Sequence, residues 1–167
     1  MERVDHIVSW VVDRCDQTYR AGNWAGRGVQ AAVADLGPQE AHWRPHPDQH
    51  TIAEIVLHMA YWKDAVAARL SGAEWAYEET QDWRQVEPTA AGLAAALAEL
   101  AAAHGRLMAQ LRMLTAARLL DPVGNAWWSP SGRALLIDLV VDVATHDSYH
   151  AAQIFVLRRL HAGRPPA

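Results

Sequence analysis

The stretch at residues 93–114, LAAALAELAAAHGRLMAQLRML, decides the fold class of this chain. Its larger side chains recur at alternating steps of four and three residues, which places them along one side of an α-helix. This seam consists of Leu93, Leu97, Leu100, His104, Leu107, Leu111 and Leu114. Alanine, which has the highest helix propensity, fills most of the positions between them. The stretch therefore predicts a long helix that packs along its length in a helical bundle.

A second seam with the same alternation lies closer to the C-terminus. It consists of Leu136, Leu139, Val143, His146, His150, Gln153, Leu157 and Leu160. We expect this helix to start between Ser129 and Arg133, because the segment before it is rich in turn-forming residues.

The first helix is predicted from an apolar stripe at the start of the chain. The stripe consists of Val4, Ile7, Val8, Val11, Val12 and Cys15. Glycine disfavours helix interiors, so Gly22, Gly26 and Gly28 should weaken or bend this helix before it continues through residues 29–36. The pair Gly37-Pro38 then ends it.

The remaining helix begins with Thr51-Ile52-Ala53-Glu54, in which the Thr51 hydroxyl and the Glu54 carboxylate can satisfy free amides in a capping box. Gly72 stops this helix, and residues 75–88 form a tryptophan-containing connection. The sequence thus predicts an all-α four-helix bundle, with irregular connections between the second and third and between the third and fourth helices. We expect residues 1–167 to form a single domain of this kind.

Composition and charge exclude several functional classes. The chain has 15 Lys and Arg against 19 Asp and Glu, a formal charge of −4, so it lacks the basic surface that nucleic acids require. Cys15 is the only cysteine and excludes an internal disulfide, which favours a cytoplasmic location. The first residues do not have the pattern of a signal peptide, and no apolar stretch is long enough to span a membrane.

Two successive seam positions of the fourth helix carry histidine instead of leucine. The spacing of His146 and His150 puts both imidazoles on one face of the helix, one turn apart, where they can converge on one ion. An imidazole buried without a partner is unfavourable by about 1–3 kcal/mol, and a shared metal would explain both. Ordinary core histidines bonded to polar neighbours remain the alternative.

A third ligand must come from another helix, and two histidines compete for this role. His58 flanks the apolar stripe of the second helix, where it can point into the bundle or stack on Trp62. His104 occupies a seam position of the third helix. There it can be a metal ligand, a residue that lines the pocket or a core histidine. Spacing alone does not choose between His58 and His104.

Other polar residues near these positions have secondary roles. His42, His46 and His50 repeat every four residues, but prolines interrupt any helix that would align them, so we expect a solvated loop or the rim of a pocket. Glu54 and Asp142 each precede a candidate ligand by one turn and can orient an imidazole through its second nitrogen. Capping explains Glu54 equally well.

Two segments of the chain have a recognisable pattern. One is Trp43-Arg44-Pro45 through Thr51-Ile52-Ala53-Glu54-Ile55-Val56-Leu57-His58, followed by Trp62. The other is His146-Asp147-Ser148-Tyr149-His150-Ala151-Ala152-Gln153-Ile154, running into Leu157-Arg158. These segments resemble the second-helix and fourth-helix signatures of the DinB-like family of metal-binding four-helix bundles (DinB/YfiT type). In helix order and spacing the resemblance covers nearly the whole chain. One departure is Ala151-Ala152, where the family commonly has Arg-Gly before the glutamine, which puts in doubt any substrate contact of that arginine.

The resemblance implies a histidine triad that maps onto His58, His146 and His150, and so favours His58 over His104. It implies a divalent transition metal, with Zn²⁺ or Ni²⁺ favoured and Fe²⁺, Mn²⁺ or Cu²⁺ compatible with imidazole ligands. It also implies a homodimer, which is common in the family. Because family members with known activity resemble transferases of low-molecular-weight thiols, it implies a small-molecule substrate as well.

Three imidazoles leave an open position on the ion, which is typical of catalytic sites. The leading hypothesis is therefore a metal-dependent enzyme, either a low-molecular-weight-thiol S-transferase or a metal-dependent hydrolase. Tyr149, Trp62 or His104 would line its pocket. The alternative is a non-catalytic metal- or small-ligand-binding stress-response protein.

Trp127-Trp128 would shape an apolar pocket or a dimer contact, or anchor the end of the bundle.

Overall fold

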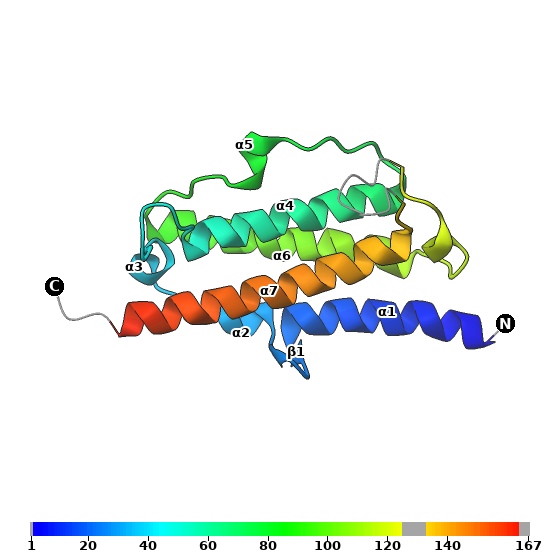
Figure 1. The fold of residues 1–167 in the computed structure, drawn as a ribbon, viewed down its shortest axis with the longest axis horizontal. Helices are drawn as coiled ribbons and strands as arrows, with labels where there is room; N and C mark the ends of the chain where they lie inside the picture. The colour runs from blue at the N-terminus through cyan, green and yellow to red at the C-terminus, as the bar shows by residue number, and fades with distance from the viewer. Residues whose placement is uncertain (1, 125–132, 164–167) are drawn as a thin grey trace.

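The computed structural model describes residues 2–124 and 133–163, with side chains from residue 6 onward. Four long helices lie side by side and form a bundle (Figure 1). They are α1 (Glu2–Arg20), α4 (Ile52–Ser71), α6 (Ala90–Arg112) and α7 (Leu136–Ala162). The predicted all-α four-helix bundle is confirmed. Within the described residues, no helix is both long and apolar enough to cross a membrane.

The first helix ends before residues 29–36, through which it was predicted to continue. The chain leaves α1 after Arg20 and forms a short antiparallel hairpin of β1 (Gly22–Asn23) and β2 (Gly26–Arg27) before α2 (Val29–Val33). Gly22 has φ 95°, and a Cβ at this position would lie 2.1 Å from the carbonyl oxygen of Gly26. The prediction of a continuous, bent helix was therefore wrong, because the glycines permit a turn too tight for other residues.

Helix α4 has the predicted ends. The Glu54 amide donates to the Thr51 hydroxyl at 3.2 Å, and the Thr51 amide donates to the Glu54 carboxylate at 2.8 Å, which completes the capping box. Gly72 follows the helix with φ 81°, the left-handed conformation that commonly ends helices at glycine.

Helix α7 begins at Leu136, later than predicted. The preceding residues are extended, because Leu135 pairs with Pro122 in an isolated antiparallel bridge and the amide of Val123 donates to the carbonyl of Ala134. The Asp138 carboxylate then accepts from the Leu135 amide at 2.8 Å and starts the helix. The predicted start therefore lay too early, and Trp127-Trp128 lies outside the described residues.

The direction of the helices explains the long connection between α4 and α6. These two neighbours run in the same direction, and α7 runs opposite to them (Figure 1). Parallel neighbours need a crossover connection, so residues 72–89 return along the length of α4. This connection contains the short helix α5 (Glu79–Asp82). Two further short helices are α3 (Pro38–Ala41) and the 3₁₀ helix η1 (Arg118–Leu120).

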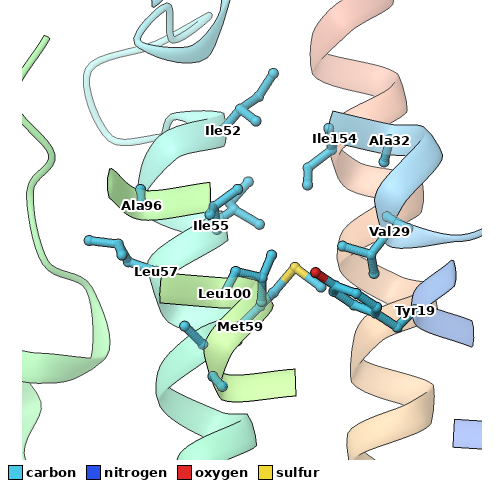
Figure 2. Close-up of a cluster of buried hydrophobic side chains, with 14 of the residues drawn as sticks. Tyr19, Val29, Ala32, Ile52, Ile55, Leu57, Met59, Ala96, Leu100 and Ile154 are labelled. Carbon is cyan, nitrogen blue, oxygen red and sulfur yellow. The ribbon is translucent and has the colours of Figure 1, made fainter. Parts of the chain in front are cut away.

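One of the buried apolar clusters that form the core lies where the four long helices meet α2. Figure 2 shows Ile55 and Met59 of α4 directed toward side chains of α1, α2 and α7, with Met59 pointing at Tyr19. Ile55, Met59 and Ile154 are fully buried. This packing fixes α4 against α7, the two helices that carry the candidate metal ligands.

Candidate metal centre

The structure brings together the three histidines that the sequence and the resemblance indicated. His58 extends from α4, and His146 and His150 extend from α7. The Nε2 atom of His146 lies 3.0 Å from Nε2 of His58 and 3.1 Å from Nε2 of His150. Two nitrogens bound to one transition metal at about 2.0–2.1 Å are separated by roughly 3.0–3.4 Å. The cluster therefore has the spacing of a coordination site.

Hydrogen bonds at the second ring nitrogen fix the tautomers of His58 and His150. His58 Nδ1 donates to Asp82 Oδ1 at 2.6 Å, and His150 Nδ1 donates to Gln153 Oε1 at 2.9 Å. A neutral imidazole carries only one proton, so Nε2 of both rings presents a lone pair. Acceptors on the second nitrogen orient metal-binding histidines in this way.

Without a cation, the cluster cannot be fully satisfied. His146 Nε2 faces two lone pairs and can donate a proton to only one of them, while its Nδ1 is buried without a hydrogen-bond partner among the described residues. A metal ion at the centre would accept all three lone pairs at once. The donor set thus fits a divalent transition metal.

Burial keeps these imidazoles neutral. Desolvation by burial lowers the pKa of His146 to about 2, and the positive charges that His150, His58 and Lys63 carry when protonated act in the same direction. Burial also lowers the pKa of His150 to about 4, and it lowers the pKa of His58 against the opposing effect of Asp82. Neutral imidazole is the form that binds metal, so the centre is prepared for a cation at neutral pH.

Asp82 organises the surroundings of His58. Besides the proton of His58, Asp82 accepts hydrogen bonds from Trp62 Nε1 at 2.9 Å and from the Tyr77 hydroxyl at 3.2 Å. The next residue, Trp83, stacks on the His58 ring with 3.7 Å between centroids. The His50 ring stacks on Trp83 in the same manner, with 3.6 Å between centroids.

His104, the competing candidate, lies away from the cluster. Its Nε2 bonds to Asp16 Oδ1 at 2.9 Å, and its ring stacks on Tyr19 with centroids 3.8 Å apart. Of the alternatives open from spacing, the core histidine held by polar and aromatic neighbours is the one that the structure shows.

The predicted supporting residues differ from those found. Glu54 is occupied by the capping box and by an ion pair with Arg44 at 2.9 Å, and Asp142 does not bond to the second nitrogen of His146. Asp82 and Gln153 have the orienting role instead. Gln153 follows the HxxxH pair in the quoted segment, whereas no periodicity marked Asp82.

A cavity of about 130 Å³ adjoins the centre on the side of His146. Arg69, Asp142 and His146 line part of it, and the rest of its wall is apolar and consists of Trp62, Ala65, Val66, Trp75, Leu139 and Val143. We call this cavity the α4–α7 slot, because α4 and α7 supply most of its walls. The predicted pocket residue Trp62 lines the slot, whereas Tyr149 borders a groove beside the β1–β2 hairpin and His104 borders neither.

The lowered histidine pKa values predict how stability depends on pH. Unfolded histidine has a pKa of about 6.5, so the unfolded chain binds more protons than the folded chain below that pH. For the metal-free protein, we expect the free energy of unfolding to decrease as pH falls from 6.5 toward 4, by up to about 1.4 kcal/mol per pH unit for each buried histidine.

Urea unfolding with EDTA present, measured at several pH values, tests this expectation. In the His146→Gln variant, the difference between the numbers of protons bound by the unfolded and the folded chain should fall by about one. The reason is that a group with a pKa of about 2 in the folded state has been removed. An equal slope in the wild type and this variant would contradict the prediction.

Fold and site together define a helical bundle with a three-histidine cluster between two of its helices. The family model of the DinB superfamily matches residues 23–154, and the chain belongs to this superfamily. A crystal structure titled as the conserved protein of locus from Enterococcus faecalis is similar in fold. It covers 96% of this chain and 98% of its own, with 18% sequence identity and a TM-score of 0.65. A comparison with curated proteins finds no match.

Proposed function

We propose that this protein is a metal-dependent enzyme that transfers a low-molecular-weight thiol to an electrophilic carbon. The observation that carries the proposal is the convergence of three imidazole nitrogens, His58, His146 and His150, beside an apolar cavity. Their ligand atoms lie within 4.8 Å of one another, and one of the three histidines, His146, also lines the slot.

The donor set favours catalysis over a structural role. Structural zinc sites have four protein ligands, whereas catalytic sites have three and an open position. Three neutral imidazoles leave the charge of the ion uncompensated. A divalent ion held there supplies a positive charge that lowers the pKa of a thiol or of water.

In the proposed reaction the thiol loses its proton to water, and its sulfur forms a bond to the electrophilic carbon. The bond between that carbon and its leaving group breaks, and the leaving group keeps the electron pair. Asp82 and Gln153 hold the ligands in position through hydrogen bonds, and Trp83 covers one face of His58. The resemblance to the DinB-like family, whose members with known activity resemble transferases of low-molecular-weight thiols, favours thiol transfer over hydrolysis by a metal-activated water.

The decisive experiment measures metal-dependent turnover. Protein loaded with Zn²⁺ or Ni²⁺ is incubated with iodoacetamide and a panel of thiols containing cysteine, glutathione and glucosamine-linked thiols such as mycothiol and bacillithiol. We expect iodide release above the uncatalysed rate with at least one thiol, lost on treatment with EDTA and restored by the metal. A protein that binds metal but turns over neither thiols nor an ester panel would instead be a non-catalytic metal binder. The expected homodimer stays a prediction.

A further inference from the structure

The α4–α7 slot has a defined length and direction. On α4 its residues are Trp62, Ala65, Val66 and Arg69, and on α7 they are Leu139, Asp142, Val143 and His146. Both sets have the spacing i, i+3, i+4, i+7, so each helix contributes one face over two turns. At 1.5 Å per residue the slot extends roughly 10 Å from the level of His146.

Small, buried side chains form part of the wall of the slot. Ala65, Val66 and Val143 are 2%, 6% and 3% exposed, so they are fixed walls of the bundle rather than mobile surface groups. The volume of about 130 Å³ is close to that of an engineered apolar cavity of roughly 150 Å³ that takes up benzene.

The charged residues at the slot do not favour an occupant of either charge. Arg69 and Asp142 both border it, and their charges are opposite. The Arg69 guanidinium lies over the ring of Trp75, 5.4 Å from its centroid, so its charge already has an aromatic contact. A neutral group is therefore the occupant that the slot suits best.

We infer that the electrophilic substrate carries a neutral apolar group of about the size of one aromatic ring, which occupies the α4–α7 slot. The reactive carbon then lies at the His146 end, next to the metal centre. This inference rests on the proposed thiol transfer for the reaction, but the occupancy of the slot can be measured without any reaction.

The binding experiment uses benzyl alcohol, an unreactive probe with one aromatic ring, and follows its affinity by NMR titration of the zinc-loaded protein. Val66→Phe fills the slot and should weaken binding by at least about tenfold. Ala152→Phe is the matched control, because Ala152 lies on the same helix as His146 but borders a different groove. It should leave the affinity unchanged. Equal binding in the wild type and a correctly folded Val66→Phe variant would overturn the inference.

A second variant enlarges the slot and does not depend on the packing of an added ring. Val143→Ala should admit 2-naphthalenemethanol, which the wild type should bind at least about tenfold more weakly than benzyl alcohol. If the wild type binds the larger probe as well as the smaller one, the inferred size is wrong.

The same variants separate the inference from the proposed function. With benzyl chloride as acceptor, Val66→Phe should lower thiol transfer by a larger factor than with iodoacetamide, which has no ring. The control Ala152→Phe should leave the rates with both acceptors unchanged. Binding of benzyl alcohol without any turnover would overturn thiol transfer and support the slot. Turnover of both acceptors unchanged in Val66→Phe would support thiol transfer and overturn the slot.

Discussion

In the His146→Ala variant, we expect the zinc content of the purified, reloaded protein to fall from about one ion per chain to near zero. His146 is the central member of the cluster, since its Nε2 makes both of the short nitrogen–nitrogen approaches. Its removal leaves one ligand on α4 and one on α7. Two imidazoles hold a transition metal far more weakly than three.

The measurement is metal analysis by mass spectrometry after dialysis, with circular dichroism to show that the variant is folded. His104→Ala is the matched control, because His104 is also a buried histidine but bonds to Asp16 outside the cluster. We expect it to retain the metal, whereas His58→Ala and His150→Ala should behave like His146→Ala. Loss of metal in His104→Ala alone would move the site to His104.

The parts of this centre differ in how far the sequence could predict them. His146 and His150 interrupt a seam of apolar residues at ligand spacing, and the structure places both at the predicted side of α7. His58 was separated from His104 only by the resemblance to the DinB-like family. Periodicity defines the face of one helix but not the distance between faces of different helices, so spacing could not decide between them.

Asp82 could not be predicted for a related reason. It lies in the connection between α4 and α6, 24 residues after His58. Its contact with His58 depends on the crossover, which returns along α4 because α4 and α6 are parallel. The sequence predicted an irregular connection but contained no signal for the direction of the next helix. By contrast, caps such as Thr51 and Gly72 are local, and these were correctly predicted.

The second large effect concerns a buried ion pair close to the centre. Lys63 and Asp147 are both fully buried, and Nζ lies 2.5 Å from Oδ2. Lys63 is on α4, five residues after His58, and Asp147 directly follows His146 on α7. The pair therefore joins the same two helices that carry the three histidines.

Removing one partner should destabilise the protein strongly. In Lys63→Met the carboxylate of Asp147 stays in the core without a cation, and breaking a buried pair in this way decreases the free energy of unfolding by about 3–5 kcal/mol. Urea unfolding of the metal-free protein measures this change. A decrease below about 1 kcal/mol would show that the pair is reached by solvent or replaced by other contacts.

The double variant Lys63→Met/Asp147→Leu distinguishes stability from positioning. Replacing a buried ion pair by apolar residues of similar size is often neutral or stabilising, so we expect the double variant to recover most of the lost free energy of unfolding. A directional contact between α4 and α7 is then absent, although the apolar packing remains. If Lys63 and Asp147 set the register of the two helices, the stable double variant should bind zinc more weakly than the wild type. If zinc affinity recovers together with stability, hydrophobic packing alone positions the histidines, and the pair has no role in the metal centre.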